Sequence, residues 1–113
     1  MDRLFRAAFW SAAAIALVAA SLPQPPRLPL EPSDKVQHIL AFVCLAALGA
    51  RGWPALSALR LALGLSAFGA LIEAVQLIPA LRRDSDPRDW LADTLAAAVV
   101  LLAIHAWRRA RRS

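Results

Sequence analysis

Charged residues divide the chain into four apolar stretches. The stretches are 7–22, 36–50, 61–81 and 91–107. The first two contain no charged residue, and the last two contain one each, Glu73 and Asp93. A membrane-spanning helix needs about 20 mostly apolar residues. The third stretch has that length by itself, and the others reach it when their flanking residues join the helix.

The residue types and the boundaries of these stretches indicate helices. Alanine and leucine favour helices, whereas the strands of a membrane barrel alternate polar and apolar residues. The proline-rich segment 23–32 cannot continue a helix, and Ser33 after it is an N-cap candidate. Pro54, with Gly49 and Gly52, separates the second and third stretches, and Pro87 suits the first turn of the fourth. We therefore predict an all-α, integral membrane four-helix bundle in one domain, 1–113, with spans of about 4–22, 34–50, 56–79 and 87–107.

Composition agrees with a membrane protein. Of the 113 residues, 59% are hydrophobic and 19% charged, and the mean hydropathy is +0.52. A soluble domain this small needs more polar residues to cover its surface, and a disordered chain has fewer apolar ones. Cys44 stands alone, which excludes a disulfide scaffold, and we expect it to be a small buried residue.

The net charge of +5 is unevenly distributed along the chain. The N-terminal segment, the 51–60 loop and the C-terminal tail together carry +7, whereas the other two loops sum to zero. The positive-inside rule therefore places both termini in the cytoplasm, with Trp53 and Trp107 at the inner interface and Trp90 at the outer one. The basic residues lie at the ends of spans and not on a folded surface, so we expect no nucleic-acid partner. Alternatively, residues 3–20 are a cleaved signal peptide, which leaves the orientation of the other spans unchanged.

Polar side chains gather near the outer ends of three predicted helices. They are Asp34, Lys35 and His38 in the second, Glu73 and Gln76 in the third, and Asp86, Asp89 and Asp93 in the fourth. Ionisable residues inside spans are costly and usually functional. We therefore predict that three helices contribute to one polar layer at the outer leaflet. A stripe of small residues, Ala62, Ser66 and then Gly69 or Ala70, continues to Glu73, which we expect to face the bundle interior near His38, Lys35 or Arg83.

Several interpretations of the polar layer stay open. It is a ligand site, or a structural network that fixes helix register. In an enzyme, Glu73 or His38 would be the general base. A proton-coupled transporter is less consistent with the sequence, because the inner halves of the helices have no ionisable residue before Arg60 and His105. Only one histidine lies on the outer side, so we expect no metal, and nothing in the sequence implies a cofactor.

Short motifs resemble the VanZ-like family of small bacterial membrane proteins. The motifs are residues 33–38 (Ser-Asp-Lys-Val-Gln-His), Phe42, residues 71–76 (Leu-Ile-Glu-Ala-Val-Gln), Arg83, and residues 89–95 (Asp-Trp-Leu-Ala-Asp-Thr-Leu). Asp93 stands where many members have Asn, and Ala96 where Gly is usual. The resemblance implies a multi-pass protein of the bacterial cytoplasmic membrane, in a family whose namesake is associated with resistance to teicoplanin.

The resemblance supplies no reaction, so the functional hypothesis rests on the polar layer. We expect it to bind or modify a lipid-linked or cell-wall headgroup at the outer leaflet. Lys35, Arg83 and His38 would hold phosphate, and Glu73 and Asp89 would orient it. Alternatively, the protein is a non-catalytic membrane subunit whose polar cluster only locks helix packing.

Overall fold

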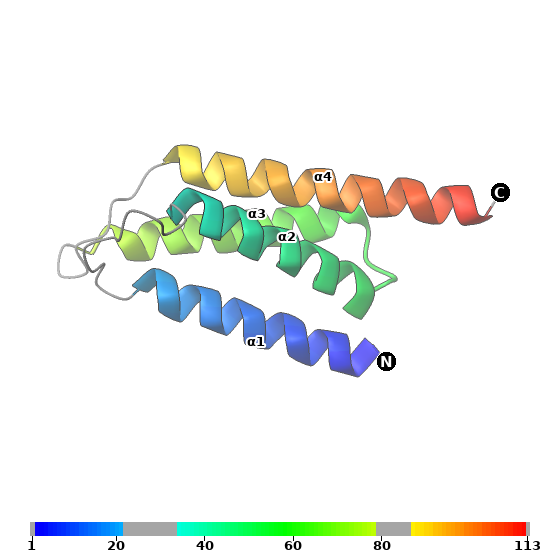
Figure 1. The fold of residues 1–113 in the computed structure, drawn as a ribbon, viewed down its shortest axis with the longest axis horizontal. Coiled ribbons are helices and arrows are strands. Elements are labelled where there is room, and N and C mark those ends of the chain that lie inside the picture. The colour runs from blue at the N-terminus through cyan, green and yellow to red at the C-terminus, as the bar shows by residue number, and fades with distance from the viewer. Residues whose placement is uncertain (1, 22–33, 79–86, 113) are drawn as a thin grey trace.

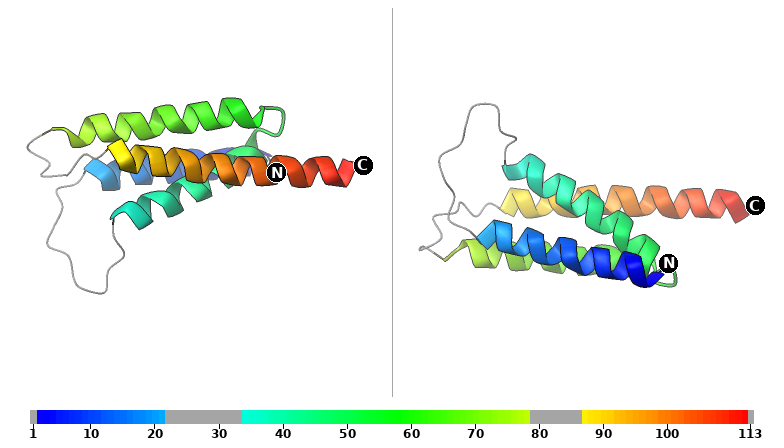
Figure 2. Two further views of the ribbon diagram at one scale, coloured as in Figure 1. Left: turned by 90° about the horizontal axis from the view of Figure 1, so that it is seen from above. Right: turned by 60° about the horizontal axis from the view of Figure 1, so that its bottom comes forward.

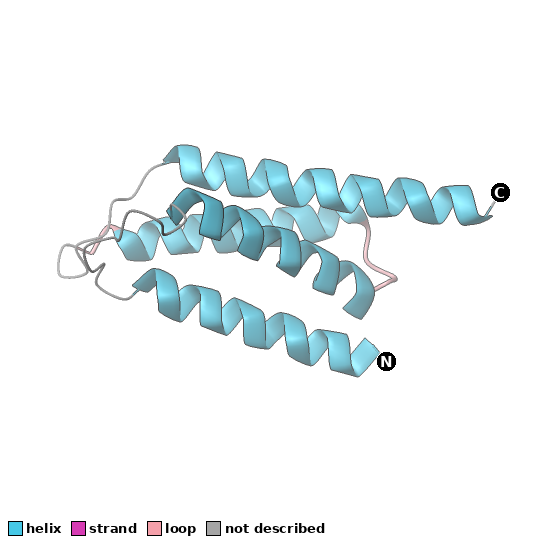
Figure 3. Cartoon of the chain, in the orientation of Figure 1, coloured by secondary structure: helices cyan, strands magenta, loops and turns pink. Residues whose placement is uncertain are grey.

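The fold of the protein is an all-α bundle. The structure, a computed structural model, describes residues 2–21, 34–78 and 87–112. The helices are α1 (Asp2–Ser21), α2 (Asp34–Gly52), α3 (Ala58–Gln76) and α4 (Pro87–Arg112). Successive helices run in opposite directions, so both termini and the α2–α3 connection lie at the same end of the bundle (Figure 1). The described part of the chain contains helices and short connections but no strand (Figure 3). The predicted all-α, four-helix architecture is confirmed.

The helix boundaries follow the local sequence signals, with two differences. Ser57 caps α3, because its Oγ accepts a hydrogen bond of 3.1 Å from the backbone N–H of Arg60. The basic tail is helical, so α4 continues to Arg112, past its predicted end at residue 107. Gly49 lies inside α2, and the helix ends only at Gly52. The predicted Ser33 and Asp86 caps lie outside the described residues.

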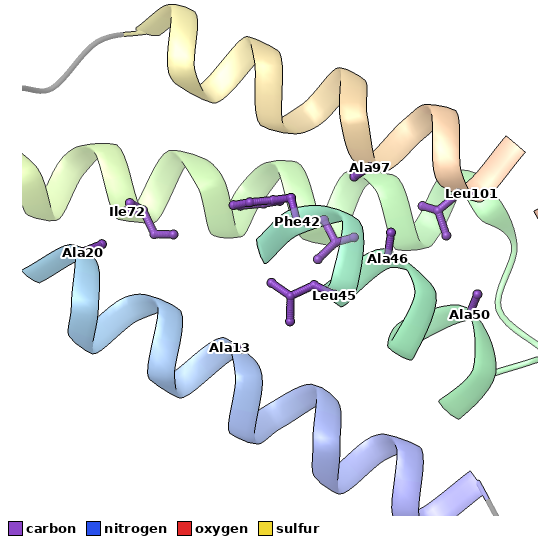
Figure 4. Packing of buried hydrophobic residues seen from close by; sticks show 10 residues of the cluster. Ala13, Ala20, Phe42, Leu45, Ala46, Ala50, Ile72, Ala97 and Leu101 are labelled. Atoms are coloured by element: carbon purple, nitrogen blue, oxygen red, sulfur yellow. The ribbon is translucent and has the colours of Figure 1, made fainter. Parts of the chain in front are cut away.

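Helix α2 is central to the packing. It lies against α1 on one side and α4 on the other, and α3 packs mainly against α4 (Figures 1 and 2). Phe42, Leu45 and Ala46 of α2 are almost fully buried, in one cluster with Ala13 of α1 and Ala97 of α4 (Figure 4). Alanines on the neighbouring helices let the backbones approach these larger side chains.

Large apolar side chains also cover the outside of the bundle. Exposed examples from the four helices are Leu4, Trp10, Ile15, Val18, Leu40, Leu63, Leu71, Leu95, Val99 and Leu102. Helices α1, α3 and α4 are long and apolar enough to cross a membrane, whereas the apolar part of α2, Val36–Gly52, is shorter. An apolar exterior on this scale suits lipid better than water.

Two glycines make close helix contacts. A Cβ atom on Gly69 of α3 would lie 3.1 Å from Cδ1 of Trp90, and one on Gly52 of α2 would lie 3.1 Å from the backbone N of Arg6. By contrast, a Cβ atom on Gly64 would meet nothing within 4 Å. Gly69 and Gly52 therefore set the distance between helices, and Gly64 does not.

Arginines from two helices satisfy the C-terminal carbonyls of α2. Nε of Arg6 donates to the carbonyl of Gly52 at 2.6 Å, and Nη2 of Arg108 donates to the carbonyl of Ala50 at 2.9 Å. The last carbonyls of a helix have no partner within the helix, and cations are favoured there. The arginines at this end therefore have a structural role in joining α1, α2 and α4.

Trp10 belongs to a ring cluster at the end of the bundle with the termini. Its ring lies 5.1 Å from that of Phe9 and 5.9 Å from that of Trp53, in edge-to-face geometry. Phe9 and Trp53 also meet edge to face, at 5.1 Å. These contacts attach the N-terminal half of α1 to the α2–α3 connection.

Candidate functional site

The polar layer contains an ionisable pair that joins α2 to α4. Nδ1 of His38 lies 3.8 Å from Oδ2 of Asp93, and the two side chains are only 14% and 3% exposed. The distance is longer than a hydrogen bond, and Nδ1 of His38 has no hydrogen-bond partner among the described residues. His38 lies one turn after the start of α2, and Asp93 lies two turns after the start of α4. Because α2 and α4 run in the same direction, both starting at this end of the bundle, the two groups lie at the same level (Figure 1).

Gln76 ties the same end of the bundle to α1. It is 4% exposed, and its Nε2 donates to the backbone carbonyl of Ala20 at 3.3 Å. Ala20 lies in the last turn of α1, where carbonyls lack a helical partner. One side chain at the end of α3 therefore satisfies an open carbonyl of α1.

Glu73 takes a more marginal position than the sequence predicted. The residues that α3 buries are Leu65, Gly69, Ile72 and Gln76. Of the predicted stripe, Gly69 is buried and its alternative Ala70 is exposed, whereas Ala62, Ser66 and Glu73 are only partly buried and lie at the edge of the buried face. Leu65 and Ile72 are larger apolar residues and occupy its centre. Glu73 and Asp89, also partly buried, therefore keep some access to the surroundings of the bundle.

Sequence reasoning missed a set of hydrogen bonds between α3 and α4. The indole Nε1 of Trp90 donates to the carbonyl of Ser66 at 3.0 Å, and Oγ1 of Thr94 bonds to Oγ of Ser66 at 3.2 Å. Trp90, predicted at the outer interface, is therefore also half-buried against α3. Trp90 and Thr94 are four residues apart on one helical face, which is the sequence signal that could have indicated a shared partner.

Three predicted site residues cannot be placed in this geometry. Asp34 and Lys35 belong to the first turn of α2, but their side chains lie outside the described residues, as does the whole of Arg83.

Among the described residues, no group of three or more His, Cys, Asp or Glu could hold a metal ion. Cys44 is exposed, so its expected burial is wrong; it points away from the face of α2 that carries Phe42 and Leu45.

No protein-family model, curated protein or solved structure matches this chain. Any account of its function therefore depends on the residues and geometry given above.

Proposed function

We propose that the chain is a VanZ-like integral membrane protein of the bacterial cytoplasmic membrane. In this proposal its polar layer binds or modifies a lipid-linked or cell-wall headgroup at the outer leaflet, in a function linked to glycopeptide resistance. The family assignment is supported by the short motifs of residues 33–38, 71–76 and 89–95. The site assignment is supported by the position and burial of His38 and Asp93.

The observation that carries the proposal is a buried carboxylate next to a histidine inside an apolar bundle. Burying an ionisable group at membrane depth is costly, and such groups usually mark a functional site. Asp93 is 2% exposed. Nδ1 of His38, which lies next to it, has no hydrogen-bond partner among the described residues. A phosphate or hydroxyl group of a ligand could accept or donate at that nitrogen.

The proposed orientation follows from the charges at the two ends of the bundle. The end with both termini carries Arg3, Arg6, Arg51, Arg60 and the four arginines of the tail, so it belongs on the cytoplasmic side. The polar layer lies at the other end. In a membrane it would therefore face the outer leaflet, where lipid-linked cell-wall intermediates are exposed.

The second candidate function is a non-catalytic subunit whose polar layer locks helix packing. The hydrogen bond from Gln76 to the carbonyl of Ala20 favours it, because that bond connects helices and offers nothing to a ligand. A buried network can fix which residues of two helices face each other even where it adds little stability.

Growth in teicoplanin separates the two candidates. The full chain is produced in a teicoplanin-sensitive bacterium as wild type, His38→Ala and Glu73→Gln, with protein levels in the membrane measured in parallel. A ligand site predicts that the wild type changes the inhibitory concentration and that both variants lose this effect at unchanged levels. Wild-type behaviour of both variants at normal levels would exclude the ligand site. Asp2→Asn, which removes a carboxylate at the opposite end, is the matched control for Glu73→Gln.

A further inference from the structure

A second candidate site lies at the opposite end of the bundle, where both termini are found. A pocket of about 210 Å³ opens there between the C-terminal ends of α2 and α4 and the start of α3. Its polar lining consists of Ser57, His105, Arg108, Arg109 and Arg112. None of the described residues that line it is acidic. The pocket therefore has a strongly positive interior.

Two observations show that this positive charge is held in place by the fold. The guanidinium of Arg108 is fixed by its 2.9 Å hydrogen bond to the carbonyl of Ala50, a residue that also lines the pocket. Arg108, Arg109 and Arg112 share the helical face at the end of α4, since residues three or four apart are neighbours on a helix. The pocket borders the N-terminal end of α3 but also the C-terminal ends of α2 and α4, so its positive charge comes from the arginines and not from helix dipoles. An arginine cluster of this kind suits phosphate, because the guanidinium donates two parallel hydrogen bonds to its oxygens.

The rest of the lining is apolar. It includes the large side chains of Leu61, Leu101 and Ile104, and Leu101 belongs to the buried core. A pocket with arginines on part of its wall and aliphatic side chains on the rest suits an amphiphile better than a free ion. The apolar exterior of α3 and α4 continues from this pocket along the bundle, where an acyl chain could lie.

We propose that this pocket binds the headgroup phosphate of an anionic phospholipid, with the first part of the lipid tail against Leu61, Leu101 and Ile104. The lipid comes from the leaflet on the side of the termini. This site is separate from the polar layer of His38 and Asp93, which lies at the other end of the bundle. It also differs from general attraction of a basic tail to a membrane, because only the arginines that line the pocket hold the ligand.

A pair of charge-matched double variants tests this distinction. Arg109→Gln with Arg112→Gln removes two charges from the pocket. Arg3→Gln with Arg111→Gln removes two charges from the same end of the bundle but outside the pocket lining; Arg111 lies instead 4.8 Å above the ring of Trp107. The full chain is purified in a neutral detergent, and bound lipid is measured by native mass spectrometry with phosphatidylglycerol or phosphatidylcholine.

The wild type is expected to retain phosphatidylglycerol in preference to phosphatidylcholine. The pocket pair should weaken phosphatidylglycerol binding about tenfold or more, because each arginine near a lipid phosphate contributes to the binding free energy. The control pair should weaken it less than about twofold. Equal weakening by both pairs, or equal retention of the two lipids by the wild type, would overturn the proposal. Sodium phosphate should displace little of the lipid; complete displacement at millimolar concentration would identify a free-phosphate site and contradict a lipid ligand.

Discussion

Nδ1 of His38 on α2 lies 3.8 Å from Oδ2 of Asp93 on α4, in the buried part of the polar layer. The contact joins residues that are far apart in sequence, and it lies next to a core of Phe42, Leu45 and Ala97. A contact in this position connects the packing of α2 and α4 directly to the proposed site.

The first prediction concerns the energetic coupling of the pair. His38→Ala and Asp93→Ala should each lower the free energy of unfolding, and the double variant should cost less than the sum by about 1 kcal/mol, because the two groups contact each other. Detergent-induced unfolding of the three variants in mixed micelles measures this coupling. His38→Ala with Asp2→Ala is the control, since these sites lie at opposite ends and should be additive. Additive costs for His38 and Asp93 would contradict the contact.

The second prediction concerns the glycines of α3. Gly69→Ala should lower the free energy of unfolding by about 1–3 kcal/mol, because the new methyl group would lie 3.1 Å from Cδ1 of Trp90. Gly64→Ala meets no atom within 4 Å and should stabilise the helix by up to about 1 kcal/mol. Thermal unfolding of both variants in detergent compares them directly. Similar effects at the two positions would show that α3 and α4 are not in close contact at Gly69.

The third prediction concerns the end of α2. Arg108→Met should destabilise the bundle by about 1 kcal/mol, because it removes the donor to the carbonyl of Ala50 and retains much of the aliphatic length. Arg111→Met, on the same helix, removes the same charge but no hydrogen bond to α2 and should have a smaller effect. Equal changes in the unfolding midpoint would mean that charge alone, and not the carbonyl contact, accounts for the loss.

The fourth prediction concerns topology. In a Cys44→Ala background, a single cysteine replaces either Ala110, in the basic tail, or Ser85, between the third and fourth helices. The positive-inside distribution predicts that a membrane-impermeant maleimide added to intact cells labels the cysteine at residue 85 and not the one at residue 110. Permeabilised cells should show labelling at both. The reverse pattern in intact cells would invert the proposed orientation and place the polar layer in the cytoplasm.

Much of the fold is predictable because its signals are local. Pro54 and Pro87 mark the ends of helices, and the uncharged stretches mark their lengths, so the helix bounds agree with expectation to within a few residues except at the C-terminus. Hydropathy predicts the apolar span but not the continuation of α4 to Arg112, because arginine is a good helix former outside the apolar region.

The candidate site was less predictable because it depends on contacts between helices. The meeting of His38 and Asp93 is consistent with their similar depth near the starts of two parallel helices, α2 and α4. The full burial of Gln76, by contrast, depends on the open carbonyl of Ala20, which no pattern within α3 indicates. The same limit applies to the hydrogen bond between Trp90 and Ser66, because it requires the rotation of two helices about their axes to be known.

The central claim, that the polar layer is open to a ligand at the outer face, is tested most directly at residue 38. In the Cys44→Ala background, His38→Cys is exposed to a membrane-impermeant maleimide in intact cells, with denatured protein as the reference for full labelling. The partial exposure of this position predicts labelling from outside without permeabilisation. Labelling only after denaturation, or only from the cytoplasmic side after permeabilisation, would contradict an outward-facing ligand site.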